Sequence, residues 1–180
     1  MILDEQSVLI FISMLDGSVG AGEILNDYLE EHGQRRIVDE DFDSLLISDR
    51  LPRILDRYLP RNIGRLIACD FAEHAIKGSS ISQERKNEAT KLLASCREFF
   101  RLESPDFQLA QKLQESIQSF AQMAREENPK NDKAVWSVWA TFMGKPSNVV
   151  LAARDAANDE ELWQLEYAIK TIPNFVDTSP

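Results

Sequence analysis

The sequence predicts an all-α fold, a single-domain multi-helix bundle with shorter N-terminal helices. Apolar residues recur at the i, i+3, i+4, i+7 spacing of amphipathic helices over four long stretches. No run of alternating Val, Ile and Thr indicates a sheet. The chain has 180 residues, 43% of them hydrophobic, which suffices for one core without a disulfide or metal. We expect one domain over residues 1–180, made of an acidic short-helix subregion (1–60), a main helical bundle (61–172) and a loose tail (173–180).

The first sixty residues are expected to form four short helices, at 5–15, 22–32, 40–48 and 50–59. The stretch "DGSVGAGE" between the first two is rich in glycine. It lacks the preceding strand and the lysine of a phosphate-binding P-loop. We therefore interpret it as a flexible helix connection.

The main bundle is predicted to begin with a helix over residues 63–76 and to continue with one over 84–101. Ser104 is expected to cap the next helix, with Pro105 at its first position and Asn128-Pro129 at its end. Its core stripe, at helical spacing, comprises Phe107, Ala110, Leu113, Ile117, Phe120, Ala121 and Ala124.

Two further helical segments complete the bundle. A helix over 132–143 is expected to bury Val135, Trp136, Trp139 and Met143, with Gly144 and Pro146 ending it. The group Trp136, Trp139 and Phe142 has core spacing and is interpreted as packing. A final alanine-rich helix runs from Ser147 to about Lys170, and a capping box at Asn158–Glu161 would restart it.

The stretch "RLIACDFAEHAI" places Asp70 and His74 one turn apart within an apolar arc. We expect both side chains to be buried and hydrogen-bonded, with Asp70 holding His74 in the core. A zinc site needs three or four ligands, and only Cys69 is nearby, pointing about 100° away. A di-iron site would need Glu-x-x-His, but Phe71 stands three residues before His74. The structural interpretation is preferred over a site built on this pair.

The two cysteines, Cys69 and Cys96, form neither a CxxC pair nor a disulfide framework. Cys96 falls on a core stripe, whereas a nucleophilic cysteine is partly exposed in electropositive surroundings. The N-terminus has no basic segment typical of a signal peptide, and no stretch approaches the roughly 20 apolar residues of a membrane span. We expect a cytoplasmic protein with no catalytic, cofactor-binding or metal-binding residues.

The net charge of −10 is unevenly distributed. Residues 1–60 hold 13 acidic and 5 basic side chains, a net charge of −8. Such a field disfavours nucleic acid and anionic membranes and attracts a basic protein. The alternative is that the charge serves solubility and that aspartates cap a helix. The predicted partner-binding residues are Glu30, Glu31, Asp39, Glu40, Asp41 and Asp43.

Two stretches resemble the helical family of bacterial putative immunity proteins. The first matches its "R-L-x-A-C-D-x-A-E" helix at Arg65, Leu66, Ala68, Cys69, Asp70, Ala72 and Glu73. The second matches an Ala/Arg/Asp-rich helix before a "W-Q" ending, at residues 152–157 and at Trp163 and Gln164. Separately, "EILNDYLEEHG" is similar to the acidic helix of a bacterial repeat-companion domain. The resemblance implies an all-helical, non-catalytic protein that neutralises a toxin, and it transfers no binding residues.

These observations favour a non-enzymatic module that binds a basic protein, such as a toxin, through its acidic first third. Two alternatives stay open at this point. One is a helical enzyme or metal-binding protein built around Asp70 and His74. The other is a structural adaptor that oligomerises through exposed apolar helix faces. The oligomeric state is not predicted.

Overall fold

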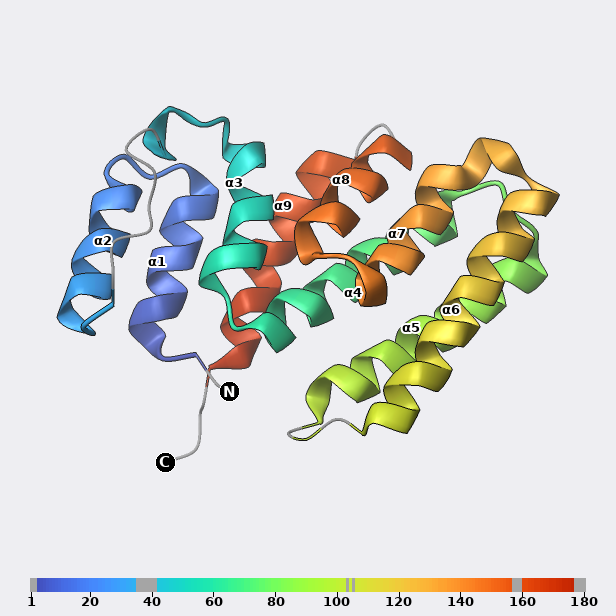
Figure 1. The fold of residues 1–180 in the computed structure, drawn as a ribbon. Coiled ribbons are helices and arrows are strands. Elements are labelled where there is room, and N and C mark those ends of the chain that lie inside the picture. Colours follow the sequence, from blue (N-terminus) through green and yellow to red (C-terminus); the bar gives the residue numbers. More distant parts are fainter. Residues whose placement is uncertain (1–2, 35–41, 103, 105, 157–159, 177–180) are drawn as a thin grey trace.

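The computed structural model describes residues 3–34, 42–102, 104, 106–156 and 160–176. Over these residues the chain folds into nine α-helices, which confirms the all-α prediction (Figure 1). The β pairing within them is one isolated bridge between Leu3 and Val176. The helices are α1 (Glu5–Asp16), α2 (Ala21–Glu31), α3 (Ile47–Arg53), α4 (Arg61–Gly78), α5 (Gln83–Arg101), α6 (Phe107–Glu127), α7 (Asp132–Met143), α8 (Pro146–Ala156) and α9 (Glu160–Thr171).

Helix α4 occupies the centre and packs against α5, α7, α8 and α9 (Figure 1). Its Ile67 and Phe71 are fully buried, because neighbours cover this helix on most sides. A Cβ atom on Gly64 would lie 2.5 Å from the carbonyl oxygen of Leu55. Glycine at this position therefore lets α4 approach the π-helical turn η2 (Ile54–Tyr58), which continues α3.

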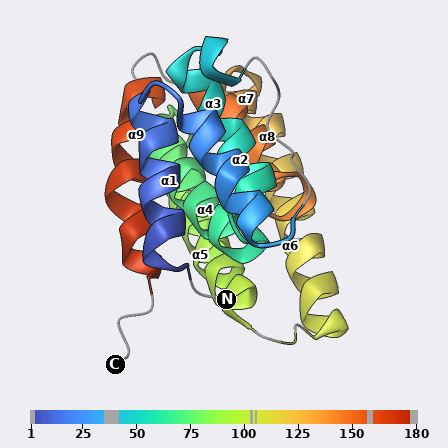
Figure 2. The ribbon, with the colours of Figure 1, turned by 90° about the vertical axis from the view of Figure 1, so that its left-hand side faces the viewer.

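Helices α1 and α2 lie at one end of the molecule. Asp4 caps α1 by accepting a hydrogen bond from the Ser7 amide at 2.7 Å, and Gly17 ends the helix with a φ of 81°. Figure 2, viewed from this end, shows α1 between α2 and α9, and α1 contacts both. At the opposite end, α5 and α6 pack against each other as a helical hairpin (Figure 1).

Several predicted boundaries were wrong. Instead of a helix over 40–48, the described part of that range has a 3₁₀ turn at Phe42–Ser44 and then α3 from Ile47. Helical structure continues through η2 although Pro52 lies inside α3, and the Ser48 carbonyl oxygen, to which a proline cannot donate, accepts from Arg154 at 2.8 Å instead. Asp106, not Ser104, caps α6, and its carboxylate accepts from the Gln108 amide at 2.9 Å. By contrast, the restart predicted within the alanine-rich segment agrees with its two helices, α8 and α9, although the predicted cap Asn158 lies outside the described residues.

The predicted burial of some side chains on α6 and α7 was also wrong. Phe107 is 80% exposed, because the α6 stripe first reaches a neighbouring helix at Leu113. Helix α7 buries Ala134, Val135, Ser137, Val138, Ala140 and Thr141. Trp139 and Phe142 pack at the edge of the core, while Trp136 stacks on Trp139 at 4.2 Å. The buried side chains of α7 are thus its smaller ones, and the tryptophans lie at the edge of the core.

The tail prediction was wrong for residues 173–176. A 3₁₀ turn spans Ile172–Phe175, and the Leu3 amide donates a hydrogen bond to the Phe175 carbonyl oxygen at 3.1 Å. Ile172 is fully buried. Together with the Leu3–Val176 bridge, these contacts fasten the described end of the chain to the start of α1.

Candidate functional site

The outer side of α2 carries a row of carboxylates. Glu23, Asp27 and Glu30 recur at the i, i+4, i+7 spacing and are exposed, with Glu31 beside them. Ile24, which is 47% exposed, borders the row. We call these five residues the acidic face. Its orientation follows from Leu25 and Leu29, which are buried on the opposite side of α2.

Charge is concentrated around the acidic face. Residues 3–34 contain seven Asp and Glu side chains and no Lys or Arg. Carboxylates this close repel one another, and no cation along this segment offsets the repulsion. A basic surface placed on α2 would relieve this repulsion, so the arrangement suits docking of a cationic partner.

The structure separates the six residues predicted to bind a partner. Glu30 and Glu31 are exposed in the last turn of α2. Asp43 lies in the 3₁₀ turn, where its carboxylate accepts a 3.4 Å hydrogen bond from the Gly22 amide and lies 3.9 Å from the Arg50 guanidinium. It therefore ties this turn to α2 and α3. Asp39, Glu40 and Asp41 lie outside the described residues.

A cavity of about 300 Å³ opens between α1, α2 and η2, on the side of α2 that carries Leu25 and Leu29. The Tyr28 side chain lines this cavity. Its hydroxyl donates a hydrogen bond to the Asp4 carboxylate at 2.9 Å and accepts one from the Ser7 hydroxyl at 2.8 Å. The Ser7 backbone amide is the main cause of the lowered pKa of Asp4, and burial raises the pKa of Tyr28. Sequence reasoning missed this group because its members are 21 and 24 residues apart.

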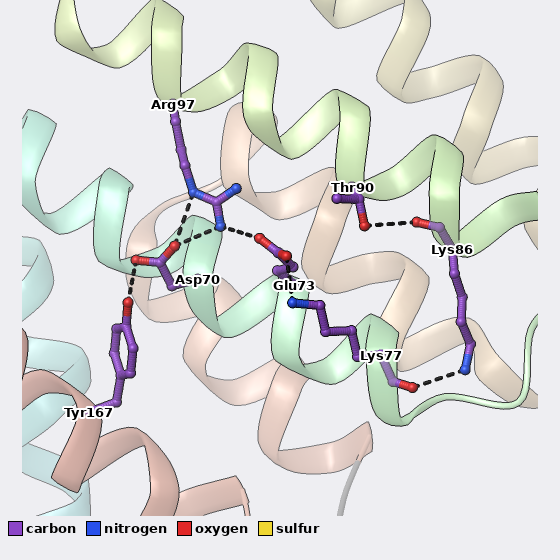
Figure 3. A network of polar contacts seen from close by, with 7 residues as sticks. All are labelled: Asp70, Glu73, Lys77, Lys86, Thr90, Arg97 and Tyr167. Atoms are coloured by element: carbon purple, nitrogen blue, oxygen red, sulfur yellow. Dashed lines mark hydrogen bonds and ion pairs between the residues drawn. The ribbon is translucent and has the colours of Figure 1, made fainter. Parts of the chain in front are cut away.

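The predicted Asp70–His74 pair does not form. Asp70 instead accepts hydrogen bonds from Arg97 of α5, at 3.0 and 2.6 Å, and from the Tyr167 hydroxyl of α9, at 2.8 Å (Figure 3). Arg97 also donates to Glu73 at 2.5 Å, and Lys77 pairs with Glu73 at 2.6 Å. The prediction was wrong because it considered only the face of one helix, whereas neighbouring helices supply stronger partners.

His74 lies on the side of α4 that faces α9 and is not buried, since 44% of its side chain is exposed. Its Nδ1 atom is 2.7 Å from Oε2 of Glu160, and its ring stacks on Trp163 at 3.7 Å. The Glu160 side chain is fully buried, and its second oxygen has no hydrogen-bond partner. Among the described residues, no three His, Cys, Asp or Glu side chains are grouped closely enough to hold a metal ion.

Glu160 gives a prediction about pH. Burial raises its pKa above the ordinary value of 4.5, against the opposing hydrogen bond to His74. The stabilisation associated with a raised pKa is present below pH 4.5 and is lost as the pH rises through the folded-state value. Glu160→Gln cannot ionise, so its free energy of unfolding should increase relative to wild type between about pH 4 and about pH 7. Urea unfolding across this range measures the difference.

The control for this prediction is Glu161→Gln, which removes the same charge from an exposed neighbouring position. Its difference from wild type should stay nearly constant over the same range. A constant difference for Glu160→Gln as well would contradict the prediction.

Both cysteines lie in the core, fully buried. Burial raises the pKa of Cys69 well above its ordinary value and that of Cys96 to about 11. Both are therefore thiols at neutral pH, whereas nucleophilic attack needs a thiolate. The geometry thus offers neither cysteine as a nucleophile.

Comparison with known proteins found no matching family model, no matching curated protein and no matching solved structure. Within the described residues, no helix is both long and apolar enough to span a bilayer. The resemblance to immunity proteins therefore stays a prediction that depends on the quoted stretches alone.

The residues that carry the resemblance make structural contacts. Arg65 donates to the carbonyl oxygens at the end of α7, while Asp70 and Glu73 bind Arg97. In the second stretch, Arg154 donates to the Gln164 side chain at 2.9 Å and to the Ser48 carbonyl oxygen at 2.8 Å. These contacts link α4 with α7, α4 with α5, and α8 with α9 and α3.

Proposed function

We propose that this chain is a non-enzymatic protein-binding module whose acidic face docks on a basic surface of a partner protein. The supporting observation is the row of Glu23, Asp27 and Glu30 on the outer side of α2, in a segment without Lys or Arg. The resemblance of residues 65–73 and 152–164 to immunity proteins makes a cationic toxin the specific partner that we propose.

Two parts of the molecule have separate roles in this proposal: α2 presents the acidic face, and the packed core of the other helices holds α2 in place. The core extends without interruption from Leu3 to Ile172, so α2 is held on a packed scaffold. Pre-organised charges accelerate encounter with an oppositely charged surface, because little ordering is left to occur on binding. Ile24 provides apolar contact area within the acidic face.

The proposal predicts that neutralising the acidic face slows association. The variant is Glu23→Gln, Asp27→Asn, Glu30→Gln and Glu31→Gln combined. With a partner captured from the native host and identified by mass spectrometry, its association rate constant should fall about tenfold at low salt. The deficit should shrink as salt rises, because exposed charges are screened over about 8 Å at physiological ionic strength. Stopped-flow or surface plasmon resonance across a salt series measures it.

The matched control neutralises four exposed carboxylates on other helices: Glu84, Glu98, Glu115 and Glu126, all changed to Gln. Both variants change the net charge equally. If the position of the charges matters, the association rate constant should therefore fall only for the variant of the acidic face. Equal association rates for the two variants at low salt would show that the charge serves solubility alone.

The adaptor alternative has one observation in its favour. Leu102, Phe107 and Leu109, at the turn between α5 and α6, are 47%, 80% and 42% exposed. Sedimentation of the purified chain tests this alternative, since a self-associating adaptor would form concentration-dependent oligomers.

A further inference from the structure

The pair of His74 and Glu160 joins α4 to α9 and takes no part in the acidic face. The Glu160 side chain is fully buried, and its Oε2 atom lies 2.7 Å from Nδ1 of His74. Its Oε1 atom has no hydrogen-bond partner. A buried carboxylate with so few partners is costly unless a positive charge lies against it. A positively charged imidazole ring at His74 would supply that charge.

The ring of His74 keeps one nitrogen atom available. Nδ1 faces the buried carboxylate and Trp163 stacks on one face of the ring at 3.7 Å, yet 44% of the side chain is exposed. Within the described residues, Nε2 has no hydrogen-bond partner. When Nδ1 donates its proton to Glu160, the lone pair of the neutral ring is on Nε2. The buried contact therefore fixes the ring with its basic, nucleophilic nitrogen unoccupied.

We propose that His74 accepts a phosphoryl group on Nε2 from a small-molecule phosphoryl donor. Nε2 attacks the phosphorus atom and forms an N–P bond, while the bond from phosphorus to the leaving group breaks and leaves its electron pair on that group. The Nδ1 proton stays in place, so the phosphorylated ring is an imidazolium cation. Glu160 lies against this cation and stabilises it, as a buried carboxylate stabilises the imidazolium in Ser-His-Asp enzymes.

Other uses of Nε2 fit the structure less well. A metal ion needs further ligands, and the described part of the chain holds no group of three His, Cys, Asp or Glu side chains that could bind one. Proton transfer to a bound substrate needs a cavity beside the ring. The cavities of about 300 and 490 Å³ are lined by other residues. A phosphoryl acceptor needs only an accessible nitrogen, because the donor brings the group to it.

A cation for the phosphoryl oxygens lies one turn along α4. Lys77 is three positions after His74, which makes them neighbours on the helix surface, and 64% of its side chain is exposed. Lys77 pairs with Glu73 at 2.6 Å, but Glu73 also accepts a hydrogen bond from Arg97 at 2.5 Å (Figure 3). Arg97 therefore still compensates Glu73 when Lys77 turns to a phosphoryl group.

The other histidine of the chain, His32, is an internal control. It is also exposed, its ring stacks on Tyr28 at 4.2 Å, and its Nδ1 atom lies 2.8 Å from the Tyr28 carbonyl oxygen. Both rings are thus exposed, stacked on an aromatic side chain and bonded through Nδ1. They differ in the acceptor, which is a buried carboxylate for His74 and a neutral carbonyl for His32.

The test incubates the full chain with potassium phosphoramidate, from which ammonia leaves, and follows both histidines by peptide mass spectrometry. At alkaline pH, where imidazole rings are neutral, His74 should react about tenfold faster than His32. Phosphorus NMR should locate the group on Nε2. Glu160→Gln keeps an acceptor for Nδ1 but removes the charge, so the rate at His74 should fall close to that at His32. Glu161→Gln, exposed at the next position, should react like wild type.

Three results would overturn the proposal. Equal rates at His74 and His32 in wild type would show that the buried carboxylate does not activate the ring. An unchanged rate at His74 in Glu160→Gln would assign its reactivity to exposure alone. Attachment of the group to Nδ1 would contradict the geometry. Circular dichroism of each variant, together with an unchanged rate at His32, confirms that the fold is retained. The outcome is independent of the acidic face, because neither histidine belongs to it.

Discussion

Replacing Arg65 by methionine is expected to lower the free energy of unfolding by about 3–5 kcal/mol. Arg65 is only 9% exposed, and its guanidinium donates to the carbonyl oxygens of Thr141 at 2.6 Å, Phe142 at 3.3 Å and Gly144 at 2.9 Å. These oxygens lie at the C-terminal end of α7, where helical carbonyls lack partners and a cation is favoured. Methionine fills the space but leaves them without a donor.

Urea unfolding, followed by far-UV circular dichroism, measures this effect. Arg61→Met is the matched control, one turn earlier on α4 but exposed, and it should change the unfolding free energy by no more than about 0.5 kcal/mol. Arg65→Lys should lie between the two, since one ammonium cannot reach all three oxygens. A loss below about 1 kcal/mol for Arg65→Met would mean that water or other donors replace the guanidinium.

Arg97→Met is expected to cost about 2–4 kcal/mol, because it leaves two partly buried carboxylates without their common partner. The Asp70, Glu73 and Arg97 side chains are 27%, 18% and 18% exposed. Asp70 would keep only the Tyr167 hydroxyl, and Glu73 only Lys77 (Figure 3). The ion pairs through which Arg97 joins α5 to α4 would be lost, while the hydrogen bond from Tyr167 of α9 to Asp70 would remain.

The pH dependence of this loss distinguishes the ion pairs from simple packing. Burial alone would raise the pKa of Glu73, but hydrogen bonds from Lys77 and Arg97 outweigh it and lower the pKa below 4.5. The stabilisation from a lowered pKa is present above pH 4.5 and disappears as the pH falls through the folded-state value. The difference between wild type and Arg97→Met should therefore shrink in acid. Arg101→Met, exposed on the same helix, is the control, and a pH-independent loss would indicate that packing dominates.

Most helices could be predicted because helical periodicity is a local property. The stripe of Ala89, Leu93 and Cys96 in α5 is buried, since 3.6-residue spacing alone places these side chains on one face. The spacing does not reveal where a neighbouring helix stops. Phe107 continues the α6 stripe but projects beyond the hairpin, and Trp136 shares a face with Trp139 that packs only partly.

Four of the residues that line a cavity of about 490 Å³ are arginines whose regular spacing is visible in the sequence, although counting charges over residues 1–60 hid it. Arg53, Arg57, Arg61 and Arg65 occur at every fourth position, a regularity that crosses Pro60 and therefore does not belong to one helix. The net charge of residues 1–60 is negative, although Arg53, Arg57 and Arg61 lie at or just beyond the end of that segment. Lys145, about eighty positions further on, joins them only because α7 and α8 pack against α4.

By itself, the sequence determined the helical class, most helix positions, the burial of Cys96 and the excess of acid in residues 1–60. The tertiary structure decided which polar groups meet. Asp70 binds Arg97 and Tyr167, which are 27 and 97 positions away, and His74 binds Glu160, which is 86 positions away. Periodicity assigns a side chain to a face because backbone geometry repeats locally. A hydrogen-bond partner depends on how whole helices cross, which is set by packing of the complete core.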